Sequence, residues 1–266
     1  FSTSTAPTHN DGEGDPVPSR HASRDELVAL ARAIRDLPGT CLEMIPGVGL
    51  WSEREKQIMT DMSLAANRPL HWNLLAPTPL SPGFAERQLG ASDYAAERGA
   101  VVVALTPPAS PTVRINLATG FVFDALPGWA DLFKQPIEER KRRLRDPAYR
   151  AELDRGANSE AAGLLRGIAR WENLVVDQVE RPENAALRGR RIGEIAKERG
   201  QVPFDCLLDL AISEDLRTSF MPSVIGDDPE SWRIRARTWG DPRAVVGASD
   251  AGAHLDMIDT FAFSTV

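Results

Sequence analysis

Residues suited to acid–base chemistry or metal binding gather near the C-terminal end of the sequence, at Ser249-Asp250 and His254. A carboxylate and an imidazole so close in the chain can exchange a proton or bind one metal ion. The apolar run 244–246 precedes them and is typical of a buried strand. An Asp directly after such a strand lies where α/β barrels place their reacting groups. The same Asp could instead cap a following helix.

Polar residues also interrupt two apolar segments, 41–45 and 70–75. Because side chains alternate along a strand, His71 and Asn73 share one face of the second segment. A polar face in an apolar strand suits the interior of an active site, but His71 could equally be a hydrogen-bonded histidine of the core. Glu43 is costly to bury unless it is paired. It lies either at the polar mouth of a barrel or on an exposed edge.

The elements that would position these residues alternate between strands and helices. Sequences typical of capping boxes begin at Ser23 and at Ser52 and predict helix starts there. Strands are predicted at 1–4, 41–45, 70–75, 101–105 and 244–246, and helices at 24–37, 53–66 and 81–98. The third helix is expected to break near Gly90. This alternation indicates a parallel sheet with helical crossovers.

Residues 109–240 interrupt the alternation before the chain returns to the sheet. They contain an aromatic-rich stretch, 121–133, which is more typical of a core or a lid than of a cofactor site. A strand is predicted at 171–179, and helices at 137–144, 149–156, 192–199, 204–212 and 229–239. We therefore interpret 109–240 as an insertion or lid region.

The composition is that of an ordinary soluble globular protein. Of 266 residues, 42% are hydrophobic and 26% are charged, and the net charge is −7. An acidic chain lacks the basic surface that nucleic acid binding requires, so no nucleic-acid partner is expected. No apolar run reaches the roughly 20 residues of a membrane span, so no membrane contact is expected. Two cysteines make no disulfide framework, and the first twenty residues lack a signal peptide core, so a cytoplasmic setting is expected.

Several segments, taken in order, resemble the amidohydrolase superfamily, specifically its N-acyl-D-amino-acid deacylase-like branch. They are Phe1-Ser2-Thr3-Ser4 with Thr8-His9, Pro16-Val17-Pro18-Ser19-Arg20, Arg68-Pro69 ahead of Asn73, Gly189-Arg190 with Ile195-Ala196, Leu207-Leu208-Asp209-Leu210, and the block 247–254. The resemblance covers nearly the whole chain, and its last block is the most specific. It implies an α/β fold: a partial (β/α)8 TIM-type barrel of the metal-dependent hydrolase kind, with a helical insertion before the last strand.

The resemblance implies a metal-dependent hydrolase that cleaves the C–N amide bond of an N-acyl amino acid or a similar small amide. In such enzymes the Asp that ends the last barrel strand is both general base and metal ligand, which points to Asp250. Zinc lowers the pKa of its bound water to about 7, which suits a carboxylate base. We expect one or two zinc (Zn) ions, with His71 as a further ligand. Substrate contacts are expected from His254, Asn73 and Ser249.

The sequence also departs from the family pattern. The family's first-strand His-x-His metal pair is not in this sequence, and Glu43 occupies the fifth strand, where the family has a metal histidine. On the sixth strand, Asn73 lies nearer the barrel mouth than His71. An alternative function is therefore a non-catalytic amidohydrolase-like module for binding or assembly that has lost metal ligands. A serine hydrolase is disfavoured because no Gly-x-Ser-x-Gly elbow surrounds Ser249.

The ends of the sequence favour a fragment of a longer polypeptide. It starts at Phe1 within a predicted strand and stops after the apolar segment 261–266. Fewer strands are predicted than the eight of a complete barrel. We therefore expect residues 1–266 to be the C-terminal part of an amidohydrolase barrel. Unpaired strand edges favour association, so a homo-oligomer or a completing chain is expected.

Overall fold

One parallel sheet organises the first part of the fold. The structure is a computed structural model and describes residues 1–11, 15–47, 49–79, 83–108, 113–120, 122–222 and 228–247. Its five-stranded sheet has the order β1-β2-β3-β4-β7, and all neighbouring strands are parallel. The strands are β1 (Ser2–Ser4), β2 (Leu42–Ile45), β3 (Leu70–Trp72), β4 (Val102–Thr106) and β7 (Ala244–Val246). The predicted α/β class with a parallel sheet is confirmed.

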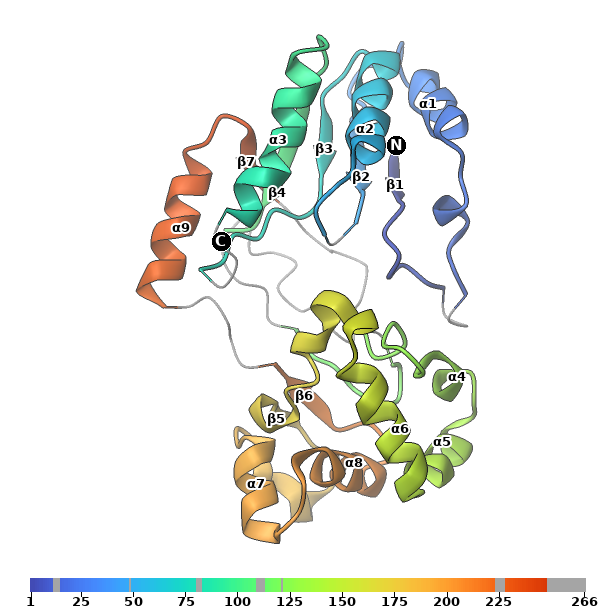
Figure 1. Ribbon diagram of the computed structural model, residues 1–266, viewed down its shortest axis with the longest axis vertical. Helices are drawn as coiled ribbons and strands as arrows, with labels where there is room; N and C mark the ends of the chain where they lie inside the picture. The colour runs from blue at the N-terminus through green and yellow to red at the C-terminus, as the bar shows by residue number, and fades with distance from the viewer. Residues whose placement is uncertain are drawn as a thin grey trace.

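Three helices cover one face of this sheet (Figure 1). They are α1 (Arg24–Ala33), α2 (Glu53–Ala66) and α3 (Phe84–Ala96), and each connects two neighbouring strands. Because crossovers between parallel strands are right-handed, strands that follow one another in this order receive their helices on the same face. This winding is that of a barrel and differs from a doubly wound sheet. The sheet is compatible with part of a TIM-type barrel, and closure is not shown among the described residues.

The core between the sheet and its helices is mainly aliphatic. Alternate residues of the strands point into it, and the buried members are Leu42, Met44, Leu70, Trp72, Val102 and Ala104. Helix positions follow from local sequence: the Ser23 side chain accepts the N–H of Glu26 at 3.1 Å, and Ser52 and Glu55 form a complete capping box. Both predicted helix starts are therefore confirmed.

Two predictions about this part of the chain are wrong. α3 runs unbroken through Gly90, because one Gly costs a helix only about 1 kcal/mol. β7 was expected to be a buried strand, yet Val245 is 48% and Val246 45% exposed. β7 is an edge strand in the part of the chain that the structure describes, where only β4 pairs with it.

Several element boundaries also differ from those predicted, for example at β3 and α3. α1 ends at Ala33, so Leu37 lies beyond it and is 52% exposed. The segment predicted as a strand at 171–179 begins with a 3-10 helix, Trp171–Asn173, because the Trp171 ring turns into an aromatic core.

Among the described residues, no helix combines the length and apolar character that a bilayer span needs.

Residues 113–222 build a second hydrophobic core. Its α-helices are α4 (Ala130–Phe133), α5 (Ile137–Leu144), α6 (Pro147–Ala157), α7 (Ile192–Arg199) and α8 (Pro203–Ser213). Its 3-10 helices are η2 (Glu160–Gly167), η3 (Trp171–Asn173) and η4 (Pro182–Leu187), and its antiparallel strands are β5 (Val175–Gln178) and β6 (Ser219–Met221). α9 (Pro229–Trp239) contacts β7 instead.

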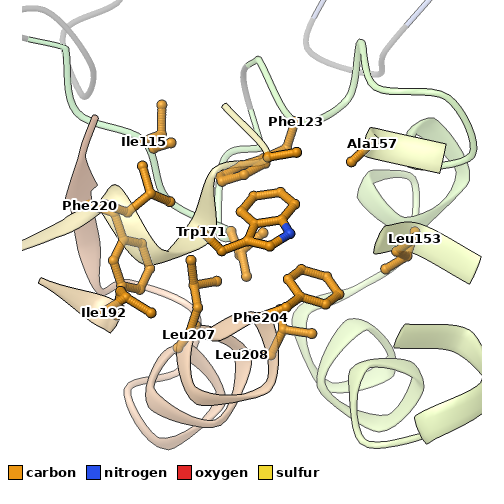
Figure 2. Packing of buried hydrophobic residues seen from close by; sticks show 14 of the residues in the cluster. Ile115, Phe123, Leu153, Ala157, Trp171, Ile192, Phe204, Leu207, Leu208 and Phe220 are labelled. Carbon is orange, nitrogen blue, oxygen red and sulfur yellow. The ribbon is translucent and has the colours of Figure 1, made fainter. Parts of the chain in front are cut away.

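Aromatic rings dominate the second core. Figure 2 shows Trp171 between Phe123 and Phe204, and its ring centroid lies 6.4 Å from that of Phe123 and 4.8 Å from that of Phe204. Trp129 is fully buried and stacks on Phe123 with centroids 5.3 Å apart. The aromatic-rich stretch predicted to be core or lid is therefore core, as far as it is described.

Candidate functional site

The sheet face opposite the helices carries the polar residues of the strands. The strand register aligns Ser2 with Glu43 and Glu43 with His71, so these side chains form a row across β1, β2 and β3. Asn73 continues this face, because its N–H donates to the Met44 carbonyl at 3.0 Å and extends the ladder beyond β3. The sequence predicted that His71 and Asn73 share a face, and the structure adds Glu43 to them.

Glu43 connects two hydrogen-bond donors on this face. Its Oε1 accepts from Nδ2 of Asn73, and its Oε2 accepts from the Ser2 hydroxyl at 3.2 Å. β2 lies between β1 and β3, so Glu43 is not on an edge strand, which was one of its two expected locations. The carboxylate is paired, as a half-buried charge within a sheet requires.

The Asn73 carbonyl oxygen has no such partner among the described residues. Its Oδ1 is buried and accepts no hydrogen bond from them. A buried acceptor without a donor costs about 1–3 kcal/mol. Native proteins tolerate few such groups, and each calls for a specific explanation. This acceptor lies just past the C-terminal end of β3, the end at which parallel α/β folds bind their ligands.

His71 lies in the same row but turns toward the backbone. Its Nδ1 is 3.3 Å from the Leu42 carbonyl oxygen, a contact that fits an Nδ1–H donor. No three His, Cys, Asp or Glu side chains come together for a metal ion in the part of the chain that the structure describes. Zinc enzymes bind their metal with about three protein ligands, so the described residues alone do not fit zinc. His71 as a metal ligand stays a prediction.

The predicted general base lies beyond the described part of the chain. Asp250, with Ser249 and His254, is outside the described residues, so their roles stay predictions. The chain is described up to Gly247, whose N–H donates to the Thr106 carbonyl at 3.0 Å. That bond places the last described residue at the C-terminal end of β4.

The loop after β1 connects the sheet to the second core. The Thr5 N–H donates to the Ile45 carbonyl at 3.0 Å, and Arg20 holds the loop by contacts to the His9 carbonyl and the Asn10 side chain. The Asn10 side chain also lies near the Asp124 carboxyl of the second core (residues 113–120 and 122–222), which is called the second region below. Burial raises the pKa of Asp124 above its usual value, and hydrogen bonds to the carboxylate oppose this rise.

These contacts fix which edge of the sheet the second region faces. A second contact joins the same two parts of the molecule: Nζ of Lys134 in the second region lies 3.6 Å from Oδ1 of Asp15 in the loop after β1. In Figure 1 the second region lies beyond the C-terminal ends of β1 to β4. Sequence reasoning missed Asn10 and Asp124, since no local pattern marks a contact between such distant segments.

The second region has a polar cluster of its own, centred on Glu214. This residue is 1% exposed, and its carboxylate accepts from the N–H groups of Glu180 and Arg181 and from the Asn184 side chain. The cluster borders a cavity of about 420 Å³ that is also lined by Arg217. These donors to the Glu214 carboxylate lie on η4 and on the two residues before it, so the carboxylate holds this segment in place.

Comparisons with known proteins add a structural likeness only. No family model and no curated protein matches the sequence. One solved structure is similar: an N-acyl-D-glutamate deacylase from Bordetella bronchiseptica, in complex with zinc and a phosphonate inhibitor that mimics the tetrahedral intermediate of the reaction. It aligns with 87% of this chain at 16% sequence identity and a TM-score of 0.43, and the chain spans 36% of that protein's length. A likeness at this level establishes neither the family nor the activity of this protein.

Proposed function

We propose that this protein is an amidohydrolase-like hydrolase whose reaction takes place at the C-terminal edge of the parallel sheet. The observation that carries the proposal is the polar row on the face opposite α1, α2 and α3. There Glu43 accepts from Asn73, and the Asn73 carbonyl oxygen receives no hydrogen bond from the described residues. An unsatisfied acceptor beside the strand ends is typical of a site that receives a ligand. The singly wound sheet and the second region beyond its edge support the same location.

The proposed reaction is cleavage of the C–N amide bond of an N-acyl amino acid or a similar small amide. Asp250 is proposed as the general base: its carboxylate takes a proton from the attacking water and returns it to the leaving nitrogen. Asn73, Ser249 and His254 are proposed to contact the substrate. Zinc is the metal proposed from the sequence, with Asp250 and His71 as ligands, and no step is derived through it because the described residues do not form its site.

We also propose that the sheet needs further strands. In the part of the chain that the structure describes, β1 pairs only with β2 and β7 only with β4. A TIM-type barrel has eight strands, so residues 1–266 would be its C-terminal part. Unpaired edges favour completion by a second copy or by another chain. Residues 109–240 would then be the insertion that covers the strand ends.

The proposed activity is tested with the full-length protein. It is incubated with a panel of N-acyl amino acids and added zinc, and the released amine is measured. Turnover of at least one compound is expected. Asp250→Asn should lower kcat by about 100- to 10,000-fold with an unchanged unfolding midpoint, because general-base catalysis contributes that much. Asp36→Asn makes the same chemical change at an exposed residue beyond α1 and should keep full activity.

Two results would contradict this proposal. Full activity of Asp250→Asn would remove its general base. An absence of turnover together with an absence of bound zinc, after expression with added zinc, would favour the non-catalytic binding or assembly module.

A further inference from the structure

The hydrogen bond between Glu43 and Asn73 determines which way the Asn73 amide faces. An ionised carboxylate can only accept hydrogen bonds, so it meets the Asn73 side chain through the NH2 group. The second carboxylate oxygen accepts from the Ser2 hydroxyl at 3.2 Å. Both oxygens are therefore engaged, and this fixes the orientation of the Glu43 carboxylate. Asn73 must therefore present its carbonyl oxygen on the side away from Glu43.

The oxygen presented in this way is the buried acceptor that receives no hydrogen bond from any described residue. Asn73 as a whole is only half-buried, so its head group lies close to accessible space. A ligand that completes this site must bring a hydrogen-bond donor or a cation. A ligand atom that carries only lone pairs would face the Asn73 oxygen as one acceptor against another.

The surrounding side chains favour an uncharged donor. Val103 is aligned with His71 and Ile45 with Ser4, so half-buried aliphatic groups share the face with the polar row. Such surroundings suit the N–H of a neutral amide, whose acyl chain can pack against them.

We propose that Glu43 is a positioning residue for amide recognition: it orients Asn73 so that Asn73 Oδ1 accepts the N–H of the substrate amide. The inference rests on the proposed amide-cleaving function and deepens it, because it assigns the group that distinguishes an amide from an ester of the same shape. Glu43 acts through Asn73 and does not itself take part in bond cleavage.

The test compares two probes of the same shape, N-acetylglycine and O-acetylglycolate, which differ only in an N–H replaced by an oxygen. Dissociation constants are measured by NMR titration in the Asp250→Asn background, so that neither probe is consumed. The amide should bind about tenfold more tightly than the ester. The amide N–H can donate a hydrogen bond to Asn73 Oδ1, whereas the ester oxygen would face it as a second acceptor.

Glu43→Gln should remove this preference in a diagnostic way. Glutamine can donate or accept, so Asn73 becomes free to face the ligand with either end of its amide. The amide probe should keep its dissociation constant within about twofold, whereas the ester should bind more tightly and the ratio should fall below about threefold. A merely structural defect would weaken both probes and would not improve binding of the ester.

Further variants make the result decisive. Asn73→Ala should weaken the amide probe alone, and it tests the acceptor independently should Glu43→Gln fail to fold. Glu97→Gln makes the same chemical change at an exposed residue after α3 and should leave the ratio unchanged. A wild-type-like ratio in Glu43→Gln, equal binding of both probes in the parent protein, or binding of neither probe would each overturn the inference. Turnover plays no part in this measurement, so its outcome is separate from that of the hydrolysis assay.

Discussion

Two carboxylates organise polar clusters in the two regions of the molecule, and they differ in how completely the cluster is paired. Glu214 in the second region is almost fully buried and accepts from donors on η4 and the two residues before it. Glu43 on the sheet face opposite the helices accepts from Ser2 and Asn73, yet within the described part of the chain the Asn73 carbonyl oxygen has no donor. A cluster whose polar groups are all hydrogen-bonded rigidifies the fold. A cluster with an unpaired acceptor can still accept a hydrogen bond from a ligand.

The hydrophobic cores of the two regions differ in the same sense. Stacked aromatic rings fill the second core, including Trp129, Trp171 and Phe204. As far as the chain is described, the core of the sheet lies on one face, and the opposite face keeps half-buried residues such as Val103 and Asn73. We therefore expect the stability of the second region to depend on the packing of its own core. The sheet region should gain less stability from packing, because one of its faces is less buried.

The largest expected effect is that of Trp129→Ala, which should lower the free energy of unfolding by about 3–5 kcal/mol. Trp129 is fully buried, and its Nε1 donates to the Leu153 carbonyl at 2.9 Å. Urea unfolding measures the loss, and hydrogen exchange locates it. Amide protection should fall more in α8 and β6 than in β2, β3 and β4.

The same substitution at Trp232 serves as the control. This tryptophan of α9 is 38% exposed, and its loss should cost about 1 kcal/mol or less. Equal loss of protection in both regions of the Trp129→Ala variant would show that the two cores unfold as one unit, and the contrast between them would be lost.

The comparison of the two carboxylates is sharpened by making the same substitution at each. Glu214→Gln should lower the free energy of unfolding by about 2–3 kcal/mol, because its neighbours all donate and glutamine offers them one oxygen and an NH2 group. Glu43→Gln should cost less than about 1 kcal/mol. Glutamine can accept from Asn73 and donate to the Ser2 oxygen, so that cluster stays paired.

Urea unfolding of both variants measures this difference. Similar losses at the two positions would mean that Glu43 is as structural as Glu214, which would weaken its assignment as a positioning residue. A larger loss at Glu43 than at Glu214 would reverse the comparison.

The features of the fold and of the site that the sequence predicts are those that depend on residues close together in the chain. Helix starts at Ser23 and Ser52 depend on residues three positions away, and the sequence predicted them. The strand alternation was likewise local, so it placed His71 and Asn73 on one face. The bond from Asn73 to Glu43 needs the register between β2 and β3, which the packing of the buried strand residues sets and no single strand encodes.

Glu214 shows the same limit in the second region. Its donors lie around η4, far earlier in the chain, and no motif in the sequence links the two segments. Exposure of β7 was missed for a related reason. An apolar run such as 244–246 predicts a strand, but its neighbours in the sheet decide whether it is buried.

The smallest expected effect concerns Arg243, an ion-pair centre on the surface of the sheet region. Its guanidinium lies 2.7 Å from Asp241, 2.9 Å from Glu86 and 2.8 Å from Asp93, and so joins the turn before β7 to α3. The hydrogen bond from Arg243 holds the pKa of Asp241 below its usual value. A lowered folded-state pKa stabilises the fold above about pH 4, the ordinary range of the carboxyl group, and this stabilisation is lost as the pH falls through the folded-state pKa.

Arg243→Gln should therefore lower the free energy of unfolding at pH 6 by about 1 kcal/mol or less, as exposed ion pairs do, and the deficit should shrink toward pH 3. Urea unfolding at both pH values measures it, with Arg32→Gln on the exposed side of α1 as the control. A deficit that stays constant from pH 6 to pH 3 would mean that Arg243 stabilises β7 by packing its side chain and not by its charge. The open edge of the sheet would then depend on apolar contact, as the second core does.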